Sequence, residues 1–380
     1  MLSSSCHFGR VKLDDSRVNV RFGADLLAVP DDVCSGAILA FVRGQRMAFR
    51  FALTGFHPLL GFTRTLNRLT LLLCLLVLTG CSGTTVLNAL TPGFGYTRQA
   101  DIVFDENTGL QLDVYVPSGV RNAPVAVFFY GGSWQEGARG GYRFVGEALA
   151  RQGLVVVVPD YRLYPAVRYP AFLQDAAQAV AWTRSHIATY GGDPESLVLM
   201  GHSAGAYNAA MLTLDPDFLA AAGVRRGAIR GMVGLAGPYD FLPLKEPALQ
   251  RIFAPAGDLR LTQPVSYADG RNPPMLLIHG RDDSRVRPGN SLRLAERVRG
   301  AGGPVEARIY DHLDHPWAVA SLAAPLRWRS DLAGVVGGFA RCVTQASTAN
   351  PSTAVSGCRD ASSTGTPVHS ETGCLTARPG

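Results

Sequence analysis

The sequence predicts an α/β protein whose central sheet is mainly parallel and is covered by helices on both faces. Short apolar runs alternate repeatedly with longer amphipathic segments, as strands and helices do in such a sheet. Two of these runs, 125–130 and 154–159, are continuously apolar, which is typical of strands buried on both faces. A third run, 197–200, meets the glycine-flanked Ser203 and then a small-residue segment. This order indicates a strand, a sharp turn and a helix.

The first elements of the predicted domain form a β-hairpin. The alternating run 110–116 and the shorter run 102–104 flank a polar turn at 107–109 that ends in glycine, and such a turn connects antiparallel strands. After the buried strand at 125–130, an amphipathic segment predicts a helix at 142–152.

The central elements surround Ser203. The strand at 154–159 precedes a long amphipathic helix at 172–187, which the breaker sequence Gly191-Gly192-Asp193-Pro194 ends. The strand at 197–200 and a helix that begins at Ala204 follow.

The last elements continue the same alternation. Strands are expected at 231–236, 275–279 and 305–310, and helices at 291–299 and 330–340. The repeated order means that the later strands add to one parallel sheet.

One segment, 241–274, interrupts this alternation. It is rich in proline and has no sustained period, so we expect an irregular insertion over the site and no large separate cap domain. The elements define one domain at 101–341, and a chain of 380 residues that is 47% hydrophobic can bury one large core. Residues 342–380 are rich in Ser, Thr, Gly and Pro, which predicts a disordered tail.

The region before this domain is expected to be a processing segment and a tether. Residues 1–80 read as an N-terminal extension that ends in a signal: two arginines precede an apolar run at 69–78. That run is shorter than the ~20 residues that cross a bilayer, but it fits a signal peptide. Leu78-Thr79-Gly80-Cys81 resembles the lipobox of bacterial lipoproteins, which implies a lipid on Cys81, a tether at 81–100 and a place in the bacterial cell envelope. An uncleaved apolar anchor stays open, as does a translation start at Met47.

Composition excludes several classes of function. The formal net charge is +6, but no basic stripe with interleaved aromatic residues appears, so nucleic-acid binding is disfavoured. No cysteine lies in 101–341, which excludes a cysteine nucleophile, a cysteine-ligated zinc and an internal disulfide framework there. The His, Asp and Glu residues show no metal-ligand spacing, and we expect neither a metal nor a cofactor.

Three residues that could perform chemistry follow predicted parallel strands, in the order Ser203, Asp283 and His315. Ligands bind at this edge of an open α/β sheet. A serine hydroxyl is a weak nucleophile unless a base takes its proton. The order serine, acid, histidine accompanies a Gly-x-Ser-x-Gly turn, and the helix after the turn directs free N–H groups toward an oxyanion beside the serine.

These features resemble a known family. From about residue 102 to 340 the chain is similar to α/β-hydrolases of the esterase/lipase group, which includes hormone-sensitive-lipase-like carboxylesterases, feruloyl-esterase-like enzymes, prenylcysteine methylesterases and kynurenine formamidases. The matching motifs are Tyr130-Gly131-Gly132-Ser133-Trp134, Asp160-Tyr161-Arg162, Gly191-Gly192-Asp193-Pro194, Gly201-His202-Ser203-Ala204-Gly205 and the segment 279–286. The resemblance implies the α/β-hydrolase fold and hydrolysis, and says little about the substrate.

The resemblance also implies a catalytic triad. Ser203 would be the nucleophile, His315 the general base, and Asp283 the carboxylate that orients the imidazole. His312 is the alternative base and Asp282 the alternative acid. Both are disfavoured, because their surroundings and spacing match the family less well.

The oxyanion hole would use backbone N–H groups of Ala204 and of the Gly132-Ser133 turn, with Gly131 allowing close approach. The family has histidine where this chain has Tyr130, and that difference is expected to change the packing of the loop and not the chemistry. Asp160 is expected to brace this loop.

We expect hydrolysis of short-chain or aryl carboxylic esters, because no large apolar lid is visible for a long acyl chain. The partner would be a small-molecule ester, besides the membrane through Cys81. Amide or formamide hydrolysis and a non-catalytic envelope binding protein are the alternatives. The oligomeric state stays open.

Overall fold

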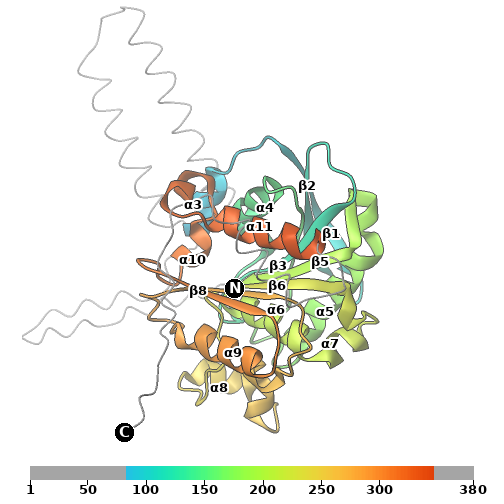
Figure 1. Ribbon diagram of the computed structural model, residues 1–380. Coiled ribbons are helices and arrows are strands. Elements are labelled where there is room, and N and C mark those ends of the chain that lie inside the picture. Colours follow the sequence, from blue (N-terminus) through green and yellow to red (C-terminus); the bar gives the residue numbers. More distant parts are fainter. Residues whose placement is uncertain (1–82, 346–380) are drawn as a thin grey trace, which may run out of the picture. The chain divides into compact units, whose positions relative to one another are not determined.

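The computed structural model describes residues 83–345, which form one eight-stranded sheet surrounded by helices (Figure 1). The strand order is β1-β2-β4-β3-β5-β6-β7-β8. β1 pairs with β2 and β2 with β4 in antiparallel fashion, and every later pairing is parallel. The strands are β1 (Tyr96–Asp105), β2 (Leu110–Pro117), β3 (Ala123–Phe129), β4 (Val155–Pro159), β5 (Gly192–His202), β6 (Ile229–Leu235), β7 (Met275–Gly280) and β8 (Val305–Tyr310).

Helices cover both faces of this sheet. α4 and α11 lie over one face, and α5, α6 and α9 lie over the other (Figure 1). The α-helices are α3 (Gly83–Ala89), α4 (Arg143–Ala150), α5 (Ala171–His186), α6 (Ala204–Leu214), α7 (Pro216–Ala221), α8 (Pro247–Phe253), α9 (Gly289–Gly300), α10 (Trp317–Ala320) and α11 (Leu332–Gln345). Among residues 83–345, no helix has the length and apolar character needed to cross a membrane.

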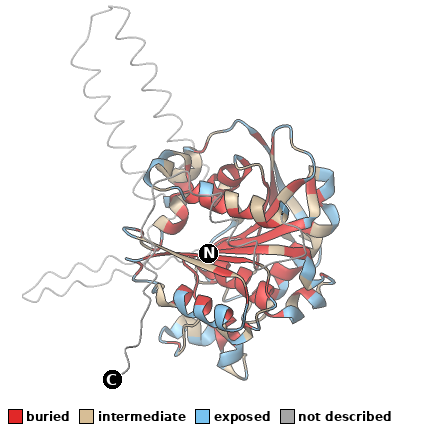
Figure 2. Ribbon diagram, viewed as in Figure 1, coloured by how far each residue is buried: buried red, intermediate tan, exposed pale blue. Residues whose placement is uncertain are grey.

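The core follows from the alternation of side chains along each strand. In β3, Val125, Val127 and Phe129 join the cluster on one face, and Ala126 and Phe128 join the cluster on the other. Both faces of the central strands are therefore buried (Figure 2). This double burial explains the continuous apolar runs in the sequence.

The strand order and the helices on both faces are those of the α/β-hydrolase fold, so the predicted fold class is confirmed. Each expected strand and helix is present, but three of them are longer than predicted: β1 begins at Tyr96, β5 begins at Gly192 within the predicted breaker sequence, and α11 ends at Gln345. The sequence pattern missed α3, α7 and α8. Segment 241–274 is less irregular than expected, because it contains α8 and two short 3₁₀ turns.

Two predicted boundaries need correction. Residues 83–100 of the expected tether hold α3 and the first part of β1, and the side chain of Asn88 fixes α3 through hydrogen bonds with Gly140 O at 2.6 Å and Phe144 N at 3.2 Å. The predicted tail begins too early, because α11 continues to Gln345 and its residue Val343 is buried. The predictions for 1–80, Cys81 and 346–380 lie outside the described residues.

Candidate active site

The turn between β5 and α6 holds Ser203 in a strained conformation, with φ 55° and ψ −123°. Two glycines make this turn possible. A Cβ on Gly201 would lie 2.3 Å from the carbonyl carbon of Gly205, and a Cβ on Gly205 would lie 2.0 Å from the carbonyl oxygen of Phe129. The Ser203 N–H donates to Leu235 O at 2.9 Å, which ties the turn to β6. Strain of this kind persists only where the surroundings enforce it.

His315 lies in the loop after β8 and connects the serine to a carboxylate. Its Nε2 is 2.8 Å from Ser203 Oγ, and its Nδ1 is 2.8 Å from Asp283 Oδ2. A carboxylate oxygen can only accept, so the proton is on Nδ1 and the lone pair of Nε2 faces the serine hydroxyl. All three side chains are buried or nearly so. This tautomer is the one that can remove the serine proton.

The carboxylate of Asp283 is held in its charged form. Burial by itself raises the pKa of Asp283, but hydrogen bonds from His279, His315 and the Val286 N–H outweigh burial and hold the pKa well below its ordinary range. The Val286 and Arg285 N–H groups donate to Oδ1 at 2.8 and 3.0 Å. Asp283 therefore stays anionic opposite the imidazole at any pH near neutrality.

Two further histidines hold this arrangement in place. His279 Nε2 donates to Val286 O at 2.7 Å and lies 3.3 Å from Asp283 Oδ2, and Ser291 Oγ lies 2.7 Å from its Nδ1. His202 Nε2 donates to His315 O at 3.0 Å. Burial, and next the neighbouring His315, lower the pKa of His202 to about 3, so this imidazole is neutral.

The alternative acid and base lie elsewhere. His312 is exposed and has a positive φ of 58°. Asp282 is also exposed, and its N–H donates to Leu313 O at 3.2 Å. Neither side chain makes a hydrogen bond with Ser203 or His315, whereas Asp283 turns inward because two amides of its own loop bind its Oδ1.

The loop after β3 lies against the serine and has an unusual backbone. A Cβ on Gly131 would lie 3.0 Å from Ser203 Cβ. The next three residues, Gly132, Ser133 and Trp134, have φ values of 137°, 53° and 59°. A Cβ on Gly132 would be 1.9 Å from Glu136 O. Within the described part of the chain, no hydrogen bond engages the N–H of Gly132 or Ser133, nor that of Ala204 in the first turn of α6. These N–H groups are available to an oxyanion.

Tyr130 holds the start of this loop. Its ring stacks on Tyr161 at 4.6 Å and on Tyr142 at 5.6 Å. Burial, and next the charge of Asp160, raise the pKa of Tyr130 far above its usual range, so the hydroxyl stays protonated and lies 3.3 Å from Asp160 Oδ1. Tyr161 OH in turn donates to Tyr130 O at 2.7 Å. An aromatic stack and a phenol thus occupy the place where the family has histidine.

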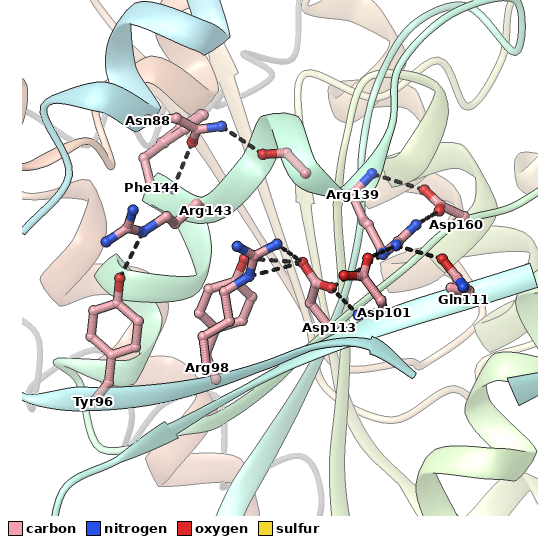
Figure 3. A network of polar contacts seen from close by, with 12 residues as sticks. Asn88, Tyr96, Arg98, Asp101, Gln111, Asp113, Arg139, Arg143, Phe144 and Asp160 are labelled. Atoms are coloured by element: carbon pink, nitrogen blue, oxygen red, sulfur yellow. Dashed lines mark hydrogen bonds and ion pairs between the residues drawn. The ribbon is translucent and has the colours of Figure 1, made fainter. Parts of the chain in front are cut away.

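Arg139 connects Asp160, the partner of the Tyr130 hydroxyl, to the antiparallel edge of the sheet (Figure 3). Its N–H donates to Asp160 Oδ1 at 2.8 Å, and its guanidinium contacts the carboxylates of Asp160, Asp101 and Asp113 and also Gln111 Oε1. Asp113 is fully buried, and removing a partner from a buried ion pair typically costs ~3–5 kcal/mol. The sequence predicted that Asp160 holds the loop after β3 but gave no sign of Arg139. The partners of Arg139 lie up to 38 residues away and form no local pattern.

An aromatic wall, defined here as Trp134, Tyr207, Phe241 and Phe253, lies beside the loop. Trp134 packs edge-on against Tyr207 at 5.0 Å and Phe253 at 5.1 Å, and it stacks on Phe241 at 6.3 Å. Tyr207 OH donates to Thr262 O at 2.8 Å. The insertion at 241–274 is therefore fastened to α6 and supplies two rings of the wall.

Comparison with known proteins agrees with this architecture. Residues 112–298 match the family model described as BD-FAE. The chain is 28% identical over 244 residues to a probable isoprenylcysteine alpha-carbonyl methylesterase of Arabidopsis thaliana, covering 58% of this chain and 51% of that protein. It is 31% identical over 225 residues to LipM, a probable carboxylic ester hydrolase of Mycobacterium tuberculosis, covering 54% and 52%. The chain spans about half the length of the curated relatives it matches.

Solved structures of esterases share the fold. Esterase 2 of Thermogutta terrifontis in its apo form is 26% identical, with a TM-score of 0.51 over 58% of this chain and 85% of the esterase. The same esterase has been solved with propionate bound and phosphonylated by sarin. The resemblance to α/β-hydrolase esterases that the motifs indicated is thus confirmed.

Proposed function

We propose that this chain is a serine hydrolase of carboxylic esters in which Ser203, His315 and Asp283 form the catalytic triad. The observation that carries the proposal is the pair of 2.8 Å contacts that His315 makes with Ser203 Oγ and Asp283 Oδ2. The similarity to proteins named esterases and carboxylic ester hydrolases supports the same chemistry.

Acylation begins when Ser203 Oγ attacks the ester carbonyl and His315 Nε2 takes the hydroxyl proton. The carbonyl oxygen becomes an oxyanion, which the N–H groups of Ala204 and of the Gly132-Ser133 turn would stabilise. Asp283 stabilises the imidazolium that forms. The tetrahedral intermediate then collapses, the bond to the leaving alcohol breaks, and His315 returns the proton to that alcohol.

Deacylation repeats these steps with water. His315 Nε2 takes a proton from a water molecule as its oxygen attacks the acyl-serine carbonyl. The second intermediate releases the carboxylic acid, and Ser203 Oγ regains its proton from the imidazole. The chain's own residues thus account for both half-reactions.

Short-chain or aryl esters are the substrates that we propose. Phe241 is the partly exposed ring of the aromatic wall and stacks on Trp134, whereas Trp134, Tyr207 and Phe253 are buried. Aromatic faces pack well against aryl groups. Esterase 2 of Thermogutta terrifontis, a structural relative, has been solved with the short acid propionate.

We also propose that the chain is anchored in a bacterial envelope by a lipid on Cys81, for which the sequence Leu78-Thr79-Gly80-Cys81 is the support. Intact-mass measurement of membrane-extracted protein tests this. A diacylglyceryl mass on a chain beginning at Cys81 is expected, and unmodified protein that retains residues before Cys81 would contradict it.

Labelling with a fluorophosphonate probe, followed by turnover of p-nitrophenyl acetate, tests the hydrolase proposal. The wild-type chain should be labelled and active, and Ser203→Ala should lose both properties while keeping its circular dichroism spectrum. An N-formyl aromatic amine is assayed in parallel. A large preference for that amide would replace ester hydrolysis with amide hydrolysis, and well-folded protein without labelling or turnover would indicate a binding protein.

A further inference from the structure

The side chain of Arg285 connects the loops on the two sides of the serine turn. Its backbone lies in the loop after β7, and its Nη2 donates a hydrogen bond to Ser133 Oγ at 3.1 Å. Ser133 belongs to the loop after β3, and β5 and β6 lie between β3 and β7 in the sheet. Ser203 follows β5, one of these intervening strands. The guanidinium therefore lies at the edge of the sheet where the proposed substrate binds.

The guanidinium of Arg285 has no ion-pair partner among the described residues and has N–H donors beyond the one bound to Ser133. Arg285 is exposed, and no carboxylate among residues 83–345 forms an ion pair with it. An arginine side chain has five N–H donors, and Ser133 Oγ accepts from one of its nitrogens. The carboxylate of Asp283 nearby is already engaged by His279 and His315. The remaining donors are free for a ligand.

The other charged side chains of the same loop do not cancel this charge. Asp282 and Arg287 are both exposed, and neither contacts Arg285 or Ser133 through its side chain. Arg281 is paired with Asp311 at 2.5 Å. Of the arginines on the loop, Arg285 is thus the one whose side chain contacts the loop at 131–134.

The geometry points to Arg285 as the binding site for a carboxylate carried by the ester substrate. This inference rests on the proposed ester hydrolysis and specifies its substrate class: esters that bear a second, ionised carboxyl group on the acyl or the alcohol part. A guanidinium binds a carboxylate through two parallel N–H donors. Because this contact exists before and during the reaction, it lowers KM more than it raises kcat.

Matched ester pairs test the inference on the full-length chain. For the acyl part, p-nitrophenyl hydrogen adipate is compared with p-nitrophenyl hexanoate, which has the same chain length and no charge. For the alcohol part, para-acetoxybenzoate is compared with its methyl ester. The measured quantity is the ratio of kcat/KM for the anionic ester to kcat/KM for the neutral ester. A general loss of activity cancels in this ratio.

We expect Arg285→Gln to lower this ratio about tenfold in at least one pair, mainly by raising KM for the anionic ester. A change of about tenfold corresponds to the loss of one charge-assisted hydrogen bond. Arg285→Lys should keep part of the preference, and added salt should weaken it in the wild type. Arg287→Gln, two residues away on the same loop, is the matched control and should leave the ratio unchanged.

A ratio that is the same in wild type and Arg285→Gln for both pairs would overturn the inference while leaving ester hydrolysis in place. If the wild type hydrolyses none of the esters and takes up no fluorophosphonate, the proposed function fails, and the inference fails with it.

Discussion

His202, the residue before the proposed nucleophile, donates its Nε2–H to the main-chain oxygen of His315 at 3.0 Å. The two imidazole rings lie 5.0 Å apart. One turn therefore carries both the serine and a support for the loop that delivers the proposed base. Because His202 is buried and neutral, it can fix the loop backbone without competing for the serine proton.

Replacing His315 with glutamine should abolish turnover. The amide cannot accept and return a proton, so kcat/KM for p-nitrophenyl acetate should fall roughly 10⁴- to 10⁶-fold. His312→Gln, a change on the same loop at an exposed position, is the control and should retain activity within about twofold. Steady-state kinetics of both variants and the wild type measures these changes in kcat/KM. Equal losses in the two variants would argue against His315 as the base.

Gly132→Ala should disable the proposed oxyanion hole. The added Cβ would lie 1.9 Å from Glu136 O, and the φ of 137° suits only glycine. The loop must move, and losing an oxyanion donor costs ~10²–10³ in kcat. Gly140→Ala is matched to it, because a Cβ there meets nothing within 4 Å. If Gly132→Ala turned over the ester at the wild-type rate, this loop would not bind the oxyanion.

Tyr130→Phe tests whether the phenol positions the oxyanion loop. The ring stack stays and the contact with Asp160 is lost, so we expect kcat to fall about three- to tenfold with KM nearly unchanged, and the free energy of unfolding to fall by ~1 kcal/mol. Tyr190→Phe is the control, because no hydrogen bond of the Tyr190 hydroxyl is seen among the described residues. A lowered stability with an unchanged kcat would show that Tyr130 serves folding alone.

The low pKa of His202 predicts acid-sensitive folding. The folded pKa is about 3 against an ordinary value of 6.5. As the pH falls below about 6.5, His202 binds a proton in the unfolded chain but stays neutral in the folded chain. The contribution of neutral His202 to the free energy of unfolding is therefore fully present above about pH 6.5. It is lost progressively as the pH falls toward about 3, by an amount of the order of a few kcal/mol.

Urea denaturation across this pH range measures the effect in wild type and in His202→Gln, whose amide can still donate to His315 O. The variant should lose less stability in acid than the wild type. His186→Gln, at an exposed histidine, should follow the wild-type curve. Parallel curves for wild type and His202→Gln would refute the assignment.

Local sequence patterns were sufficient for the order of strands and helices and for the turn around Ser203. Each of these depends on residues a few positions apart: apolar runs of strand length, periodic helices and glycines that relieve a strained serine. The missed helices α3, α7 and α8 span seven, six and seven residues, and so short a segment carries little periodicity. α3 is held largely by contacts with Gly140 and Phe144, more than fifty residues away.

The sequence by itself determined the fold class, the strand ends at which chemistry could occur, and the residues Ser203, Asp283 and His315 as candidates. Only the tertiary structure decided how these ends meet. His315 reaches Ser203 across 112 residues and Arg285 reaches Ser133 across 152, while Arg139 joins carboxylates of three separate segments. Periodicity reports which face of an element is buried, but not which distant side chain lies against it. That choice follows from the sheet order and from the packing of loops above its edge.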